Sequence, residues 1–206
     1  MSYQDVWIRG KLVKKGRRSC EGRFEAIRDY MQRTRKKHPL TVLDLGANAG
    51  YFSFRLAEEL DAKVTMIESS PEILQYHKQN ANRNVSLIHK RVDAHYLRQL
   101  AKSKHYDAVL ALSVVHHFRN YPEVIDALFS LGDCLFIEPP SIDEKKHSPS
   151  ASNLIVGIYQ YLLPKAPYIL TYTPKTGDLN DRVKVPLRPL FVFDQQKRFH
   201  AFTPVS

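Results

Sequence analysis

Residues 42–54 read VLDLGANAGYFSF and decide how the rest of the chain is interpreted. An apolar run ends at Asp44, a turn carries Gly46, Asn48 and Gly50, and a helical pattern follows at once. Small residues at the carboxyl end of a strand let a ligand lie against the backbone. The order D-x-G-x-N-x-G differs from the G-x-G-x-x-G of dinucleotide sites, and no Gly-Lys-Ser/Thr of a P-loop follows. We therefore expect a cofactor of another kind.

Apolar runs and helical patterns alternate on both sides of this stretch. We predict strands at 41–45, 63–68, 84–89, 106–115 and 134–138, with helices at 51–60, 70–82, 94–102 and 122–131. Repeated units of this length require a parallel sheet with right-handed crossovers. Two later runs, 168–173 and 189–194, finish the sheet as a pair. The prediction is an α/β, Rossmann-like, doubly wound and mostly parallel seven-stranded sheet with an antiparallel edge strand, in a single domain.

The flanking segments differ from this regular core. Residues 1–38 are predicted to form a basic cover, with an irregular arm over 1–18 and a helix that Ser19 caps and that runs to Lys37. Residues 39–206 form the domain proper. Within it, a polar, Pro/Ser-rich stretch and a helix at 153–164 indicate a substrate-shaping insert at about 139–166.

Composition sets the broad class of protein. The 206 residues are 43% apolar and carry a formal net charge of +10, which favours an anionic partner. Much of the excess lies in 9–37, with a smaller group at 182–188 that includes Arg182 and Lys184. Cys20 and Cys134 have no metal or disulfide spacing and fit a reducing compartment. With no apolar leader or long apolar run, we expect a soluble, cytoplasmic protein without a membrane span.

The glycine-rich stretch resembles motif I of the class I S-adenosylmethionine-dependent methyltransferases. The resemblance extends over roughly 41–140 and implies S-adenosylmethionine as cofactor and S-adenosylhomocysteine as product. It places the first turn around the methionine part of the cofactor. Asn48 stands where the family has a glycine, and Asn tolerates positive φ better than most residues. The residues implied at this end of the cofactor are Asp44, Gly46, Ala47, Asn48, Gly50, Tyr51 and Phe52.

Later positions agree with the same resemblance. Glu68 follows Gly46 by 22 residues at the end of the second strand, where a carboxylate can accept both ribose hydroxyls, and Ser69 adds backbone contacts. Asp93 corresponds to the position that meets the adenine amino group, with Val92 or Ala94 flanking the ring; a plain helix cap is the alternative. Ser113 is expected beneath the sulfonium.

The segment SVVHHF, residues 113–118, supplies the candidate catalytic groups. Methyl transfer to a hydroxyl requires alignment and a proton acceptor, and the resemblance implies that His116 is this base. His117, if the segment is extended, points the opposite way. Either histidine could instead pack or orient a loop. Glu138 is expected with them as a third candidate catalytic residue, in the role of a substrate-side polar group or a turn anchor. A metal site of the two histidines and Glu138 is disfavoured, so no metal is predicted.

The acceptor is inferred from short segments at both ends. GRRSCEGRF (16–24) and RPLFVF (188–193) resemble methyltransferases acting on phosphorylated glycans, including O-antigen chain-terminating kinase/methyltransferases. Guanidinium groups match phosphate or carboxylate, so the expected acceptor ligands are Arg17, Arg18, Arg23 and Arg188. We predict O-methylation of an anionic small-molecule or glycan acceptor. The alternatives are an RNA methyltransferase that uses the basic N-terminal segment and a cofactor-binding but inactive partner protein.

Overall fold

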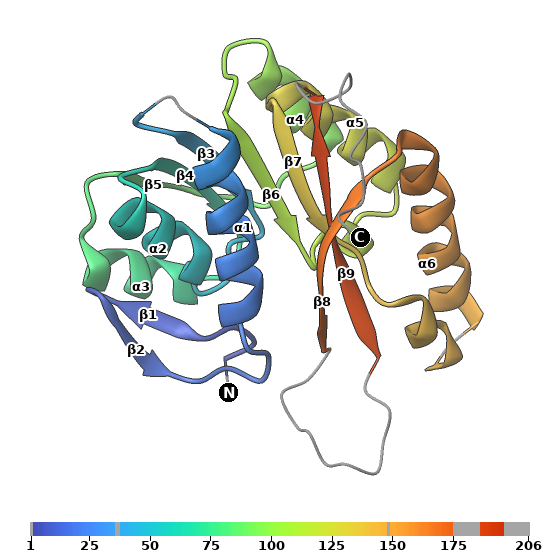
Figure 1. The fold of residues 1–206 in the computed structure, drawn as a ribbon, viewed down its shortest axis with the longest axis horizontal. Helices are drawn as coiled ribbons and strands as arrows, with labels where there is room; N and C mark the ends of the chain where they lie inside the picture. The colour runs from blue at the N-terminus through green and yellow to red at the C-terminus, as the bar shows by residue number, and fades with distance from the viewer. Residues whose placement is uncertain (1, 36–37, 148, 175–185, 196–206) are drawn as a thin grey trace, which may run out of the picture.

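A seven-stranded sheet runs through the centre of the computed structural model (Figure 1). Its order is β5-β4-β3-β6-β7-β9-β8. The strands are β3 (Thr41–Leu45), β4 (Lys63–Glu68), β5 (Val85–His89), β6 (Ala108–Leu112), β7 (Cys134–Glu138), β8 (Tyr168–Pro174) and β9 (Leu187–Asp194). The structure describes residues 2–35, 38–147, 149–174 and 186–195, so Arg182 and Lys184 of the late basic group lie outside the described residues.

The first five strands of the sheet are parallel, and the last two form a hairpin. β9 pairs antiparallel with both β7 and β8, so it lies between β7 and the edge strand β8. The predicted antiparallel pairing at this edge is confirmed, as is the Rossmann-like, mostly parallel seven-stranded sheet in a single domain.

Helices cover both faces of the sheet. They are α1 (Glu21–Thr34), α2 (Tyr51–Glu59), α3 (Glu72–Asn80), α4 (Ala94–Ala101), α5 (Tyr121–Leu131) and α6 (Pro149–Leu162). In β6, Ala108 and Leu110 pack into the apolar layer of α1, α2 and α3, whereas Val109 and Ala111 pack into that of α4, α5 and α6. This two-sided burial explains why the strand reads as an unbroken apolar run.

The first residues form a hairpin, so the prediction of an irregular arm over 1–18 is wrong. β1 (Val6–Ile8) pairs antiparallel with β2 (Lys11–Lys14). Asn80 of α3 holds the hairpin: its Nδ2 donates to the Trp7 carbonyl at 3.0 Å, and its Oδ1 accepts from the Arg9 N–H at 3.0 Å. All four residues of β2 are exposed, so the strand lacks the alternating pattern that would reveal it from sequence.

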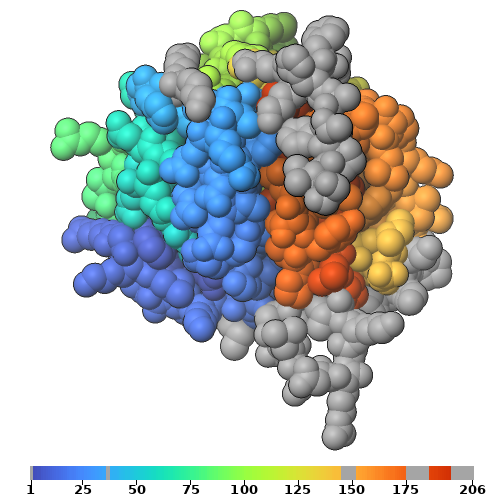
Figure 2. Space-filling model, in the orientation of Figure 1, coloured from blue at the N-terminus to red at the C-terminus, as the bar shows by residue number. Residues whose placement is uncertain are grey.

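Helix α1 begins at Glu21 rather than after a Ser19 cap. The Asp5 carboxylate, distant in sequence, accepts the backbone hydrogen bonds just before the helix. The Cys20 N–H donates to Asp5 Oδ2 at 2.9 Å, and the Gly16 N–H donates to Asp5 Oδ1 at 2.8 Å. The helix ends at Thr34 and lies beside β8 (Figure 2). α1 therefore ties the N-terminal segment to the last hairpin of the sheet.

Strand β6 ends earlier than predicted, and this changes the histidine segment. Ser113 has φ 57°, and the chain then turns into the 3-10 helix η1 (Val115–His117).

The predicted insert contains η2 (Ile142–His147), α6 and η3 (Leu163–Lys165), and its role in shaping the substrate site remains a prediction. Among the helices of the described residues, none is both long and apolar enough to cross a bilayer.

Candidate active site

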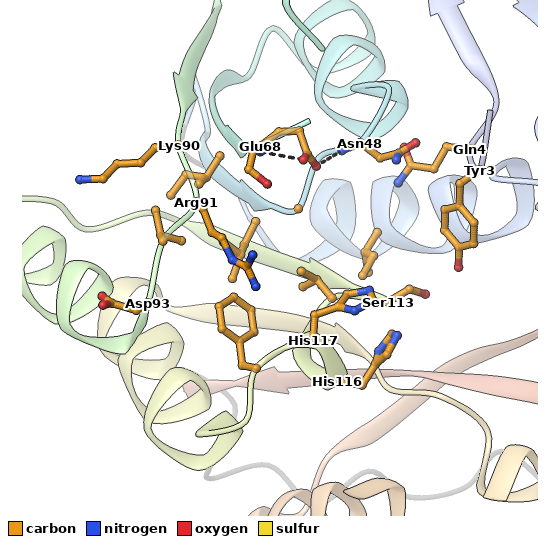
Figure 3. A pocket seen from close by; sticks show the side chains of 18 of the residues that line it. Tyr3, Gln4, Asn48, Glu68, Lys90, Arg91, Asp93, Ser113, His116 and His117 are labelled. Atoms are coloured by element: carbon orange, nitrogen blue, oxygen red, sulfur yellow. Dashed lines mark hydrogen bonds between the residues drawn. The ribbon is translucent and has the colours of Figure 1, made fainter. Parts of the chain in front are cut away.

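A pocket of about 830 Å³ lies at the carboxyl ends of the central strands (Figure 3). The loops after β3, β4, β5 and β6 contribute to its wall, together with β9 and the N-terminal segment. Its polar and charged lining residues are Tyr3, Gln4, Asn48, Glu68, Ser69, Lys90, Arg91, Asp93, Ser113, His116, His117, Arg119, Asn120 and Arg188. The sequence motifs therefore meet at one edge of the sheet.

The loop after β3 is built by backbone geometry. Gly46 has φ 75°, and a Cβ there would lie 2.6 Å from Val114 Cγ2, so the position requires glycine. Asn48 has φ 52°, a conformation that Asn tolerates better than most residues. Its N–H donates to Glu68 Oε2 at 2.8 Å. Glu68 Oε1 accepts from the backbone N–H groups of Ser69 and Ser70, each at 2.7 Å. Glu68 therefore joins two loops while lining the pocket.

The opposite end of the pocket carries Asp93 (Figure 3). Its Oδ1 accepts from the Tyr96 N–H at 2.8 Å, which is the helix cap considered from sequence. Asp93 is exposed and lines the pocket, so capping leaves its second oxygen available to a ligand. Ser69 also lines the pocket, whereas Ala94 is buried in the core behind it.

Several predicted cofactor residues do not line the pocket, and two are corrected. Tyr51 and Phe52 are buried in the layer of α1, with ring centroids 5.5 Å apart and Tyr51 6.1 Å from Phe24. Their side chains are core residues, because the first turn of α2 faces that layer. Ala47 is buried, and Gly50, with φ 77°, shapes the turn before α2.

Asp44 is buried beneath the loop and supports it. Its Oδ2 accepts from Ser53 Oγ at 2.7 Å. Burial, opposed by the Ser53 hydrogen bond and assisted by the nearby Glu68, raises the pKa of this carboxyl to about 7. Asp44 is outside the pocket lining, so any effect on a ligand passes through the loop.

Glu138 is the centre of a buried ionic network, and its assignment as a catalytic residue is corrected. Its Oε1 accepts from Arg18 at 2.5 Å and from Thr173 at 2.8 Å, while Oε2 accepts from Arg23 at 3.1 Å and from Ser113. Burial alone would raise its pKa, but Arg23 and Arg18 outweigh burial and lower it. The carboxylate is ionised, fully buried and fully bonded, so it has no position left for a substrate.

The four predicted acceptor arginines occupy different environments. Arg18 and Arg23 are each 1% exposed and bind Glu138, so neither is a direct acceptor ligand. Arg17 is exposed but does not line the pocket. Arg188 does line it: Nε and Nη2 bind Glu144 at 2.6 and 2.8 Å, and Nη1 donates to Ser113 at 3.0 Å.

His116 and His117 both line the pocket, with ring centroids 4.2 Å apart. The turn of η1 places them together rather than on opposite sides. Burial, together with His117 and Arg188, lowers the pKa of His116 to about 4. A neutral imidazole with so low a pKa is a weak base near pH 7, which favours a positioning role. In the part of the chain that is described, its Nδ1 has no hydrogen-bond partner, and no three His, Cys, Asp or Glu side chains gather as metal ligands.

Sequence reasoning missed Tyr3 and Gln4, which form one wall of the pocket (Figure 3). Gln4 is 3% exposed, and its Oε1 is buried with no hydrogen-bond partner among the described residues. A backbone bridge between Gln4 and Arg18 holds the segment in place. This long-range pairing has no local sequence signal. Arg91 and Arg119 of the lining were also missed.

Comparison with known families assigns the central part of this fold. Residues 43–133 match the family described as "Methyltransferase domain". This match assigns residues 43–133 to a methyltransferase domain. The match covers the glycine-rich loop of this methyltransferase domain, Glu68, Asp93 and the two histidines. No curated protein matches the chain.

Solved structures share the fold of the methyltransferase domain. The bifunctional kinase-methyltransferase WbdD is 18% identical, with a TM-score of 0.66 over 88% of this chain and 41% of the WbdD chain. The plantazolicin methyltransferase BpumL in complex with SAH is 17% identical, with a TM-score of 0.56 over 83% of this chain and 82% of that chain. The chain thus spans about two fifths of WbdD.

The residues present in the methyltransferase domain fit S-adenosylmethionine, the cofactor of this family. Gly46 contributes only backbone to the pocket lining, and Glu68, which already accepts three backbone N–H groups, retains one acceptor position, on Oε2, for a hydroxyl group. Gln4 offers the buried, unpartnered Oε1 to a donor such as an ammonium group. We propose that Gly46, Asn48, Glu68, Ser69 and Asp93, together with Gln4, are the groups that would hold it.

We predict that Glu68→Ala weakens the binding of S-adenosylhomocysteine by about 1.5–3 kcal/mol, roughly 10- to 150-fold. The substitution removes hydrogen bonds to a charged carboxylate and releases the Asn48 loop. Isothermal titration calorimetry measures the change. Glu72→Ala is the matched control, because Glu72 is a neighbouring glutamate outside the pocket lining. Equal affinities in wild type and Glu68→Ala would contradict the assignment.

Proposed function

We propose that the protein transfers the methyl group of S-adenosylmethionine to an oxygen atom of an anionic small-molecule or glycan acceptor. S-adenosylmethionine, when bound, supplies an electrophilic methyl carbon. The chain's own residues then bind the acceptor, orient it and exclude water. WbdD, which has a similar fold, is a bifunctional kinase-methyltransferase, and a phosphorylated acceptor agrees with that description.

The charge of the pocket lining is the observation that favours an anionic acceptor. Arg91, Arg119 and Arg188 line the pocket, whereas its lining carboxylates, Glu68 and Asp93, are the two assigned to the cofactor. The Arg91 guanidinium extends into the space between Glu68 and the histidines (Figure 3). Arg188 is already paired with Glu144, so a phosphate or carboxylate would balance Arg91 and Arg119 as well as the positive sulfonium.

His116 supports the same proposal as a positioning group. It lines the pocket beside Ser113, and its buried Nδ1 is unpartnered among the described residues. A neutral imidazole can accept a hydrogen bond from an acceptor hydroxyl or donate one to its anionic group. We propose that His116 orients the acceptor, with His117 closing the same side of the pocket.

Methyl transfer from labelled S-adenosylmethionine tests the function. The panel pairs phosphorylated and acidic sugars with their neutral counterparts and adds an RNA oligonucleotide. We expect kcat/KM for anionic sugars at least about 10-fold above that for neutral ones, the size of one charge-assisted hydrogen bond. Arg119→Gln should reduce this preference several-fold, and Arg98→Gln, an exposed arginine outside the pocket lining, should not. Transfer only to RNA, preference for neutral sugars, or cofactor binding without transfer would overturn the proposal.

A further inference from the structure

Tyr3 has an unusual environment for a tyrosine that lines a pocket. Its Oη accepts hydrogen bonds from Arg18 Nη1 at 3.2 Å and from Arg188 Nη1 at 3.4 Å. The ring stands on the pocket wall below Gln4, with its hydroxyl directed toward the side of Ser113 (Figure 3). A phenol oxygen that faces two guanidinium donors is held as an acceptor, which favours its ionised form.

The charges around Tyr3 act in the same direction. The groups that face it or bind its neighbours are Arg18, Arg23, Arg188, Glu138 and Glu144. These described groups comprise three guanidinium cations and two carboxylates. One positive charge therefore remains unbalanced within this set, and an anionic phenolate would neutralise it.

We propose that Tyr3 takes up the proton of the acceptor hydroxyl during methyl transfer, an inference that rests on the proposed function. As the acceptor oxygen bonds to the methyl carbon, the carbon–sulfur electron pair stays with the departing thioether. The hydroxyl proton passes to the phenolate oxygen of Tyr3. Arg18 and Arg188 hold that oxygen in place, and His116 orients the acceptor.

The acid–base properties of the two candidate groups agree with this division of roles. Burial alone would raise the pKa of Tyr3, but Arg18 and Arg188 outweigh burial, so its pKa lies below the ordinary value of 10. His116, with a pKa of about 4, lies well below neutrality. A proton acceptor is most effective when its pKa is near the working pH. The pKa of Tyr3 is shifted downward, toward that range.

Tyr3→Phe tests the inference because it removes only the oxygen. With the acceptor that wild type methylates best, we expect kcat to fall by roughly 100-fold or more while the affinity for S-adenosylhomocysteine is retained. Tyr172→Phe, a change at an exposed tyrosine of β8 outside the pocket lining, is the matched control and should keep wild-type kcat. A pH titration of tyrosinate absorbance gives a second readout. The difference between wild type and Tyr3→Phe should show one tyrosine that ionises below pH 10.

The outcomes separate this inference from the proposed function. An active wild type with an equally active Tyr3→Phe variant would overturn the role of Tyr3 alone. So would a difference titration in which Tyr3 ionises at or above pH 10. A wild type that transfers no methyl group to any acceptor would overturn the proposed function and the role of Tyr3 with it.

Discussion

Glu138→Ala is expected to lower the free energy of unfolding by about 3–5 kcal/mol, because it leaves two buried guanidinium groups without a counter-ion. Arg18 and Arg23 are each 1% exposed, and both bind the Glu138 carboxylate. Removing one partner of such a cluster costs more than the pair contributes, since the remaining charges stay out of water. Urea denaturation followed by circular dichroism measures the difference.

The control for Glu138→Ala is Glu123→Ala. Glu123 also pairs with an arginine, Arg98, at 3.1 Å, but both side chains are about half exposed or more. Exposed pairs contribute about 0–1 kcal/mol, so this variant should unfold near the wild-type midpoint. If Glu138→Ala does not fold, Glu138→Gln keeps the shape and two acceptor positions for the same measurement. Loss of less than about 1 kcal/mol in both Glu138 variants would contradict the account of the network.

The second large effect is a pH dependence of stability that originates from Asp44. Its pKa is about 7 in the folded protein and 3.8 as the ordinary value. The folded state therefore holds a proton that the unfolded state releases, so this group's stabilisation is complete below about pH 4 and is lost as pH rises to about 7. The difference between the two pKa values corresponds to roughly 4 kcal/mol across that window.

Asp44→Asn isolates this contribution because the amide is neutral at every pH and can still accept from Ser53. The free energy of unfolding of wild type minus that of the variant should fall steadily from pH 5 to pH 7 and then level off. Other titrating groups contribute equally to both proteins and cancel. A pH-independent difference would show that Asp44 is ionised throughout.

Local sequence patterns predicted those parts of the site that are formed by residues close together in the sequence. The loop of Gly46 and Asn48 and the position of Glu68 follow from strand ends and turn chemistry, which spacing along the chain reveals. The fold followed from alternating apolar runs for the same reason. The turn at Ser113 was missed because its positive φ is rare for serine, and it reversed the expected relation of His116 and His117.

The remaining wall of the pocket depends on contacts between distant segments. Tyr3 bonds to Arg188, and Arg18 bonds to Thr173, at sequence separations of 185 and 155. Local periodicity does not reveal such pairs. For this reason the sequence predicted Arg18 and Arg23 to be acceptor ligands, although both are buried in ion pairs with Glu138. The excess of basic residues near the N-terminus thus divides between an internal network and the exposed strand β2.

The position of β9 between β7 and β8 has a consequence for the order of folding. Arg188 and Thr173 are on the hairpin that is synthesised after all the parallel strands, whereas their partners Tyr3 and Arg18 are near the start of the chain. Contacts between segments so far apart form slowly, since a long loop must close first. We therefore expect the contacts of Tyr3 with Arg188 and of Arg18 with Thr173 to form late in refolding, so that methyl transfer is recovered after the glycine-rich loop has formed.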